Sequence, residues 1–313
     1  MAGIECLRAL NDAGIVTERP IEVAVWMNEE GSRFAPGAMG SSAFVDPRRL
    51  ASYLDVTDAA GESVRHALKA FRQRFPHLPP RPDDGIAAFI ELHIEQGPVL
   101  EQAGLPLAVV EGIQGVRWYQ VTCRGESAHA GTTPMAGRRD AMRLARTVAD
   151  RIESALADVP ADELRLTFGR WEVLPNAINT VAAGVSFTVD FRHPDPAVLA
   201  CLDRLMEQII NDDVQVAALL NQPPVAFDGM LSRLLMDSSG ALDIPFTTLR
   251  SGAFHDAMHL AGYCPSSMLF VPSHKGISHN PSEYTDPRSL RLGAQVLACA
   301  LTELACLSEG DVI

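Results

Sequence analysis

Two adjacent carboxylates, Glu29 and Glu30, stand out because a pair of acids at this spacing could do chemistry. They follow the apolar, β-branched run 21–26, which predicts a buried strand. Two bare carboxylates this close would repel and raise each other's pKa, whereas a metal cation would stabilise both. One could ligate the cation while the other takes a proton from water that the metal activates. The alternative is a solvated strand end.

Two histidines, His93 and His279, lie near the ends of later predicted strands. His93 shares the polar face of the predicted strand 86–95 with Glu91 and Glu95, because side chains two residues apart on a strand point to the same side. A histidine flanked by acids is typical of a metal ligand with carboxylate support, although it could also be a surface histidine among surface acids. Ligand sites in open α/β sheets lie at the carboxyl ends of strands. We therefore expect both histidines to converge with the acidic pair.

The order of predicted elements indicates an α/β domain interrupted by a second domain. Residues 1–113 and 225–313 alternate helical and strand patterns. Residues 114–224 follow the order β-α-β-β-α-β, which is the ferredoxin-like pattern, and end in an Asn-Gln-Pro-Pro linker. We therefore predict a main domain built from the first and last segments, with the middle segment inserted.

Composition excludes several classes of partner. The formal net charge of the 313 residues is −13, and no block is rich in lysine and arginine. We therefore expect neither nucleic acid nor a membrane as a partner. The six cysteines are scattered without a Cys-x-x-Cys pair, which indicates reduced thiols in a cytoplasmic protein.

Seven segments resemble the M20-type metal-dependent amidohydrolases, and most closely their amidase/hydantoinase/carbamoylase branch. That branch includes N-carbamoyl-L-amino acid hydrolases, allantoate amidohydrolases and bacterial-type β-ureidopropionases. The segments are residues 28–34, 91–101, 128–135, 175–179, 189–194, 252–257 and 270–283. The sequences His-Ile-Glu-Gln-Gly (93–97) and His-Ala-Gly-Thr-Thr-Pro (129–134) separate this branch from ordinary M20 peptidases.

The resemblance implies a site with two divalent metal ions, usually zinc, manganese, cobalt or nickel. It assigns Glu29 as the general acid/base. It assigns Glu30 and His279 as ligands of one metal and His93 as a ligand of the other. Residues 1–113 and 225–313 would then form the catalytic domain of the M20 fold.

The resemblance also implies that the ferredoxin-like insertion is a lid and a dimerisation surface. His129 is expected to reach the active site of a neighbouring subunit and stabilise negative charge on the attacked carbonyl. Asn179 and Arg192 are expected in the substrate pocket, where a guanidinium can grip a carboxylate with two hydrogen bonds. Alternatively, His129 could only stabilise its own loop, and Arg192 could pair with Asp190 or Asp195. Weaker pocket candidates are Gln96, Ala253 and His255.

The chain departs from the family pattern at its start. Family members begin earlier, with a His-x-Asp motif and a metal-bridging aspartate, so this chain resembles an N-terminally truncated member. One metal would keep only His93, and the other only Glu30 and His279, whereas zinc sites normally have at least three protein ligands. We therefore expect these residues alone to bind metal weakly and to hydrolyse little. Phe254 also stands where the family usually has glycine.

The resemblance implies hydrolysis of a linear amide C–N bond in an N-carbamoyl (ureido) compound. Examples are N-carbamoyl-L-amino acids, allantoate and ureidopropionate. A first alternative is an inactive remnant that dimerises through its lid. The metal content of the protein would distinguish this remnant from an active hydrolase. A second is an M20 aminoacylase or peptidase, which activity on acyl rather than carbamoyl amino acids would distinguish.

Overall fold

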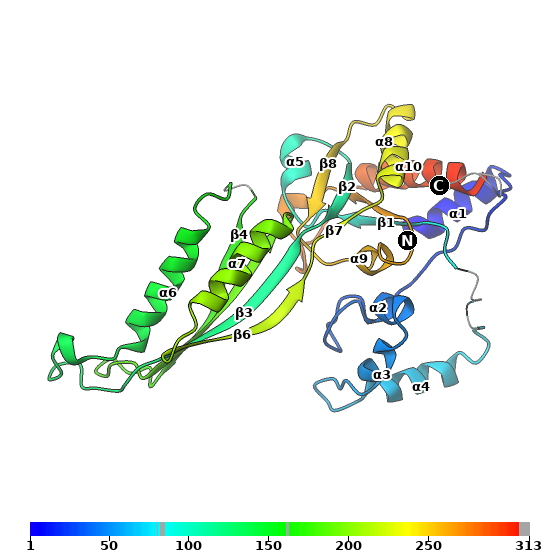
Figure 1. The fold of residues 1–313 in the computed structure, drawn as a ribbon. Coiled ribbons are helices and arrows are strands. Elements are labelled where there is room, and N and C mark those ends of the chain that lie inside the picture. The colour runs from blue at the N-terminus through cyan, green and yellow to red at the C-terminus, as the bar shows by residue number, and fades with distance from the viewer. Residues whose placement is uncertain (80, 82–84, 161–162, 307–313) are drawn as a thin grey trace. The chain divides into compact units, whose positions relative to one another are not determined.

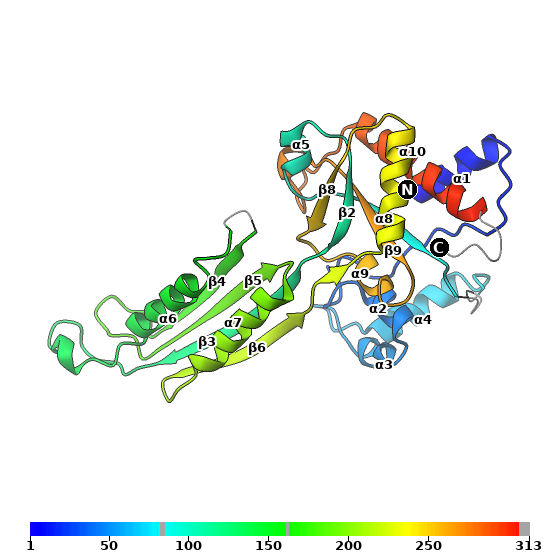
Figure 2. The same ribbon diagram turned by 45° about the horizontal axis from the view of Figure 1, so that its top comes forward.

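A computed structural model describes residues 1–79, 81, 85–160 and 163–306 of the chain. These residues form two compact units, one joining Met1–Ile113 to Ala226–Ile313 and the other comprising Gln114–Val225 (Figures 1 and 2). Each unit has its own sheet and its own apolar core.

The first unit is organised around a five-stranded sheet with strand order β1-β9-β2-β7, in which β8 also pairs with β2. The strands are β1 (Phe89–Ile94), β2 (Ala108–Ile113), β7 (Val225–Ala226), β8 (Thr247–Ser251) and β9 (Ser266–Val271). β1 and β9 are parallel, and Ile94 pairs with Val271 at their carboxyl ends. The loops that follow these two strands therefore leave the sheet at the same edge.

Helices cover both faces of this sheet. α8 (Gly229–Ala241) and α10 (Pro287–Cys306) pack on one face, and α1 (Ala2–Asp12) lies along α10 (Figure 1). α9 (Ala257–Leu260) packs on β1 and β9 from the other face and contacts α2 (Met39–Val45). Ile90, Leu92 and Ile94 of β1 point into the core beneath α10. Because side chains alternate along a strand, Glu91 and His93 face α9. The other helices described in this unit are α3 (Arg49–Leu54), α4 (Val64–Arg74), α5 (Val99–Ala103) and η2 (His274–Gly276).

The prediction of a buried strand at residues 21–26 is wrong. This segment is extended but forms no ladder, and β1 is the last strand at its edge of the described sheet. Val25 is 89% exposed, whereas Trp26 packs with its ring 5.3 Å from that of Phe44. A β-branched run becomes a strand only when a neighbouring strand pairs with its backbone, and no described strand does so here.

The second unit confirms the predicted β-α-β-β-α-β order. Its strands form an antiparallel sheet in the order β4-β5-β3-β6, and α6 and α7 lie together on one face of it (Figure 2). The elements are β3 (Gly115–Arg124), η1 (Met135–Gly137), α6 (Ala141–Ala155), β4 (Arg165–Leu174), β5 (Gly184–His193), α7 (Pro196–Gln208) and β6 (Val214–Gln222). Asp140 and Asp195 cap the two helices by accepting backbone N–H groups.

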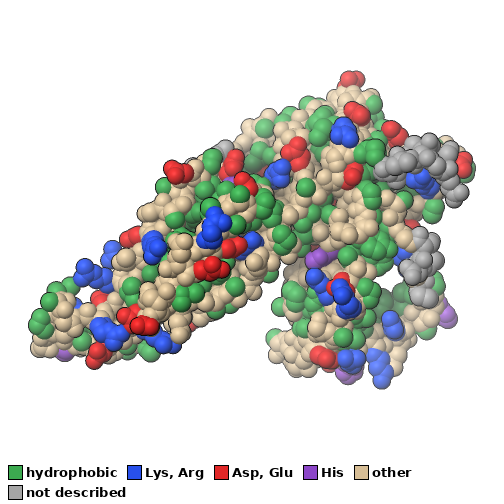
Figure 3. All heavy atoms as spheres, in the orientation of Figure 1, with side chains coloured by type: hydrophobic (Ala, Val, Ile, Leu, Met, Phe, Trp, Pro, Cys, Tyr) green, Lys and Arg blue, Asp and Glu red, His purple; other side chains and the backbone are tan. Residues whose placement is uncertain are grey.

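On the face of the molecule drawn in Figure 3, acidic and basic side chains are interspersed over the second unit and are not gathered into a patch of one sign. Among the described residues, α10 is the helix long and apolar enough to cross a membrane by length and composition. Its residues Val296, Leu297 and Ala300, however, are buried in the core of the first unit, so α10 serves there as a core helix.

Replacing leucine by alanine at a buried position, Leu202, and at an exposed position, Leu219, tests the core of the second unit. Leu202 on α7 is 0% exposed, whereas Leu219 on β6 is 53% exposed. We expect Leu202→Ala to lower the free energy of unfolding by about 2–5 kcal/mol, because it leaves a cavity. Leu219→Ala should change it by less than about 0.5 kcal/mol. Denaturant unfolding followed by tryptophan fluorescence measures both, and equal losses would contradict the assigned core.

Candidate functional site

Glu29 and Glu30 lie in a compact turn, residues 27–38, which we call the acidic turn. The side-chain amide of Asn28 closes it by donating to two carbonyls across the turn, at 2.7 and 3.1 Å. Gly37 approaches so closely that an added Cβ would lie 2.5 Å from the carbonyl oxygen of Glu29. The two carboxylates are therefore held adjacent by the backbone of the turn, in place of the strand end that the sequence predicts.

The structure brings the acidic turn close to both predicted histidine ligands. Nε2 of His279 lies 3.3 Å from Oε2 of Glu30. Burial and the charge of Glu30 raise the pKa of Glu29, while the nearby His93 and His279 act to lower it. Glu30, His93 and His279, from three separate parts of the sequence, therefore all lie within electrostatic reach of Glu29 in the first unit.

The loop that carries His279 is tied to the end of β1. The backbone N–H of Gln96 donates to Oγ of Ser273 at 3.0 Å, and its side-chain amide donates to Oγ of Ser278 at 3.0 Å. The side-chain carbonyl oxygen of Gln96 is buried without a hydrogen-bond partner among the described residues. Gln96 thus holds the loop and also offers an unsatisfied acceptor beside it.

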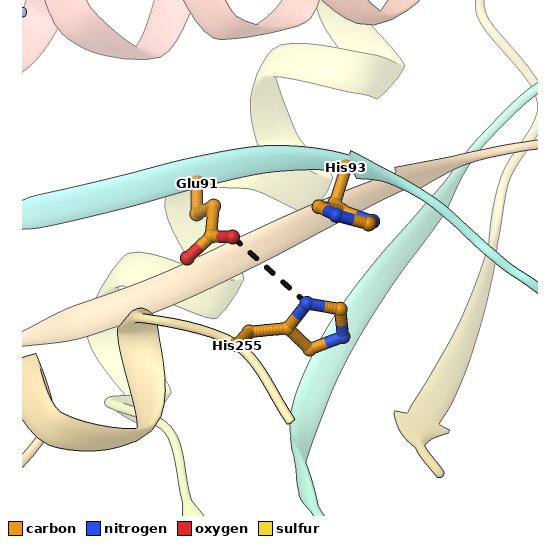
Figure 4. Close-up of side chains that lie close together, drawn as sticks. All are labelled: Glu91, His93 and His255. Atoms are coloured by element: carbon orange, nitrogen blue, oxygen red, sulfur yellow. Dashed lines mark ion pairs between the residues drawn. The ribbon is translucent and has the colours of Figure 1, made fainter. Parts of the chain in front are cut away.

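A second cluster, which we call the triad, consists of Glu91, His93 and His255. One potential ligand atom from each lies within 4.8 Å of the others. Figure 4 shows Glu91 and His93 projecting from the same side of β1 towards His255, which precedes α9. Nδ1 of His255 is 3.9 Å from Oε1 of Glu91, and the two imidazole centroids are 4.6 Å apart.

Hydrogen bonds assign the ring protons of both triad histidines. Nδ1 of His93 lies 2.8 Å from the carbonyl oxygen of Ile94, which can only accept, so this nitrogen carries a proton, and in the neutral ring Nε2 has a free lone pair. When Oγ of Ser251 donates to the carbonyl of Ala253, it accepts from Nε2–H of His255 at 2.8 Å. In that tautomer Nδ1 of His255 is an unprotonated acceptor, and it is buried with no hydrogen-bond partner in the described structure. Such an orphaned acceptor fits a cation.

The pKa shifts in and around the triad also suit a metal site. Burial is the main cause that raises the pKa of Glu91 to about 7, although the backbone N–H of Ala257 opposes it. Burial also raises the pKa of Asp256 to about 6, against the hydrogen bond from Ser41. Burial and the neighbouring His93 lower the pKa of His255 to about 3, so its imidazole is neutral near pH 7. Neutral imidazoles and a carboxylate are suitable ligands for a divalent metal.

Sequence reasoning underestimated this region of the site. His255 was expected only as a pocket residue, and Asp256 and Ser41 were not expected to matter. The Ser41–Asp256 hydrogen bond joins α2, which follows the acidic turn, to the segment that carries His255. Alternation along β1 puts Glu91 on the same side as His93, but no sequence signal reveals a serine contact across the fold.

His129 and Asn179 lie in the second unit, and both are exposed there. Nδ1 of His129 accepts the backbone N–H groups of Gly131 and Thr132, each at 3.1 Å, so the proton of the neutral ring is on Nε2. The backbone carbonyl of Asn179 accepts the N–H of Ala130. His129 therefore stabilises its own loop, as one alternative expected, and also keeps an N–H available as a donor.

Arg192 makes the fork-like pair with Asp190 that the sequence left as an alternative. Its Nε and one terminal nitrogen lie 3.0 and 2.9 Å from the two carboxylate oxygens. Both side chains are about one-third exposed, at 28% and 32%. A substrate carboxylate would have to compete with Asp190 for this guanidinium.

Comparisons with known proteins agree with the geometry. The model of the peptidase family M20/M25/M40 matches residues 1–303. Allantoate amidohydrolase of Escherichia coli is 38% identical over 295 residues, which are 92% of this chain and 71% of that protein. N-carbamoyl-L-amino acid amidohydrolase of Geobacillus stearothermophilus is 34% identical, covering 97% of this chain and 76% of that protein. A crystal structure of an amidase of the hydantoinase/carbamoylase family from Burkholderia multivorans has a TM-score of 0.88 and 40% identity, covering 98% and 76% of the two chains.

The raised pKa of Glu91 predicts how stability depends on pH in metal-free protein. Between its ordinary pKa of 4.5 and the folded value of about 7, the unfolded chain releases a proton that the folded chain keeps. The contribution of Glu91 to the free energy of unfolding should therefore fall as pH rises through this window, against an opposite contribution from the lowered pKa of His255, and Glu91→Gln should remove the fall. Denaturant titrations in chelator at pH 5 and pH 8 measure this. Exposed Glu303→Gln is the control, and an unchanged slope in Glu91→Gln would refute the assignment.

Proposed function

The chain belongs to the peptidase family M20/M25/M40 and is an enzyme of its metal-dependent amidohydrolase type, and on that premise we propose that it hydrolyses a linear N-carbamoyl (ureido) compound. The observation that carries the proposal is the meeting of Glu29 with Glu30, His93 and His279 in the first unit. The substrate class is supported by the relatives, which are named for allantoate and for N-carbamoyl-L-amino acids.

In this proposal Glu30, His93 and His279 would hold zinc, manganese, cobalt or nickel, and the bound ion would supply the Lewis-acid chemistry that polarises a carbonyl and acidifies a water molecule. Glu29 accepts the proton from that water and passes it to the leaving nitrogen. A general base must lie within reach of the proton that it takes, and Glu29 lies beside Glu30, His93 and His279, the proposed metal ligands. Ammonia, carbon dioxide and the amino acid are the products.

We assign His129 to charge stabilisation in the neighbouring subunit of a homodimer that forms through the second unit. The proton on Nε2 supports this role, because the ring can donate to an oxygen that gains negative charge. Asn179 and Arg192 would orient the substrate in the same complex. Six free cysteines support our further expectation that the enzyme is cytoplasmic.

Glu29→Gln should reduce turnover by roughly 10²–10⁴-fold, the usual contribution of a general base. Bound metal should stay nearly unchanged, since the proposal gives Glu29 no ligand role. Ammonia release from N-carbamoyl amino acids, with metal content by elemental analysis, measures both quantities. Glu303→Gln, an exposed change on α10, is the matched control. Near-native turnover of Glu29→Gln would show that another group is the base.

Arg192→Lys should raise KM for substrates with a free carboxylate much more than for their amide analogues. Lysine keeps the positive charge but loses the planar fork that grips a carboxylate. Arg124→Lys, an exposed change in the same unit, is the control. If both kinds of substrate are affected equally, Arg192 serves only its pair with Asp190.

The second unit should dimerise with or without metal, because its surface contains none of the proposed metal ligands. Sedimentation velocity at micromolar concentration, with and without chelator, measures the mass. A monomer under both conditions would remove the basis for His129 acting across subunits.

A further inference from the structure

We propose that Glu91, His93 and His255 together form one three-ligand metal site, in which Glu91 and His255 complete the coordination of the ion assigned to His93. This inference extends the proposed function, because it concerns the metal on which that function depends. The sequence had offered His93 as the sole recognisable ligand of this ion, and for that reason predicted weak binding.

The first argument is the unsatisfied imidazole. His255 is 1% exposed, and its Nδ1 has no hydrogen-bond partner among the described atoms. Its lone pair points into the space shared with Glu91 and His93 (Figure 4). Burying an acceptor without a partner costs on the order of 1–3 kcal/mol, so a group that satisfies it stabilises the fold.

The second argument is that a hydrogen bond fixes the orientation of each imidazole ring, as in metal-bound histidines. The carbonyl of Ile94 fixes the ring of His93, and Ser251 fixes the ring of His255, each by accepting an N–H. Metal-bound histidines characteristically donate their other ring N–H in this way. Glu91 is oriented in turn by the backbone N–H of Ala257, 2.9 Å from its second oxygen.

The third argument is distance. Bonds of about 2.0–2.1 Å in a tetrahedral zinc site leave neighbouring ligand atoms roughly 3.4 Å apart. The observed 3.9 Å between Nδ1 of His255 and Oε1 of Glu91 is close to that spacing, and one ligand atom of each triad residue lies within 4.8 Å of the others. Two neutral imidazoles, one carboxylate and an open position match the donor set of a catalytic zinc site.

The test uses zinc alone and no substrate. The full chain is titrated with Zn²⁺ against a chelating indicator, and with Co²⁺ by visible absorption. We expect one ion to bind more tightly than the second. Glu91→Gln and His255→Asn should each weaken the tighter ion by more than about 100-fold, beyond the cost of losing an outer partner. Ser251→Ala should weaken it by roughly 10–100-fold, because it only frees the ring of His255.

His193→Asn is the matched control. His193 is also buried, at 2% exposure, and lies 3.4 Å from a glutamate oxygen, but it belongs to the second unit. This variant should keep the wild-type affinity and cobalt spectrum. Glu91→Gln is isosteric and Ser251→Ala removes one hydroxyl, so far-UV circular dichroism should find folded variants to compare. Wild-type zinc affinity in the folded triad variants would overturn the site. That result would leave the hydrolysis proposal standing, because ammonia release from N-carbamoyl amino acids tests that proposal separately.

Discussion

The first unit gathers four acidic side chains around β1. The repulsion among these carboxylates is the constraint on which the arrangement of the candidate site depends. Glu29, Glu30, Glu91 and Asp256 come from three separate segments of the chain, and the pKa values of three of them are raised. Buried carboxyl groups that repel one another destabilise a fold unless protons or cations offset the charge. A divalent ion does this permanently, and the imidazoles that it also needs already lie among the acids.

Backbone contacts position the acidic and histidine side chains of the candidate site as much as side-chain contacts do. The parallel pairing of β1 with β9 sends two loops off one edge, and Gln96 ties the loops together. The acidic turn depends on the close approach of Gly37 to the carbonyl of Glu29. A site assembled from such short loops needs their mutual restraint, because a metal tolerates little error in the position of its ligands.

Features that depend on a local pattern of residues, such as the face of a strand or the order of elements, could be predicted from the sequence. Alternation placed Glu91 and His93 on one face of β1, and periodicity gave the element order of the second unit, which the structure confirms. Sequence reasoning failed at residues 21–26, because an apolar β-branched run needs a paired neighbour before it becomes a strand. It also missed the contribution of Asp256, since its bond to Ser41 joins residues 215 positions apart and no periodicity reports such a contact. The forked pair of Arg192 with Asp190 was foreseen only as an alternative, because two residues on one strand face suit either role.

Anomalous X-ray diffraction from crystals grown with zinc tests the central claim most directly, because it locates the ion without reference to activity. The account predicts a peak bounded by the carboxylate of Glu91, Nε2 of His93 and Nδ1 of His255. A second, weaker peak is predicted between Glu30 and His279. A well-occupied zinc that touches neither His93 nor His255 would contradict the account.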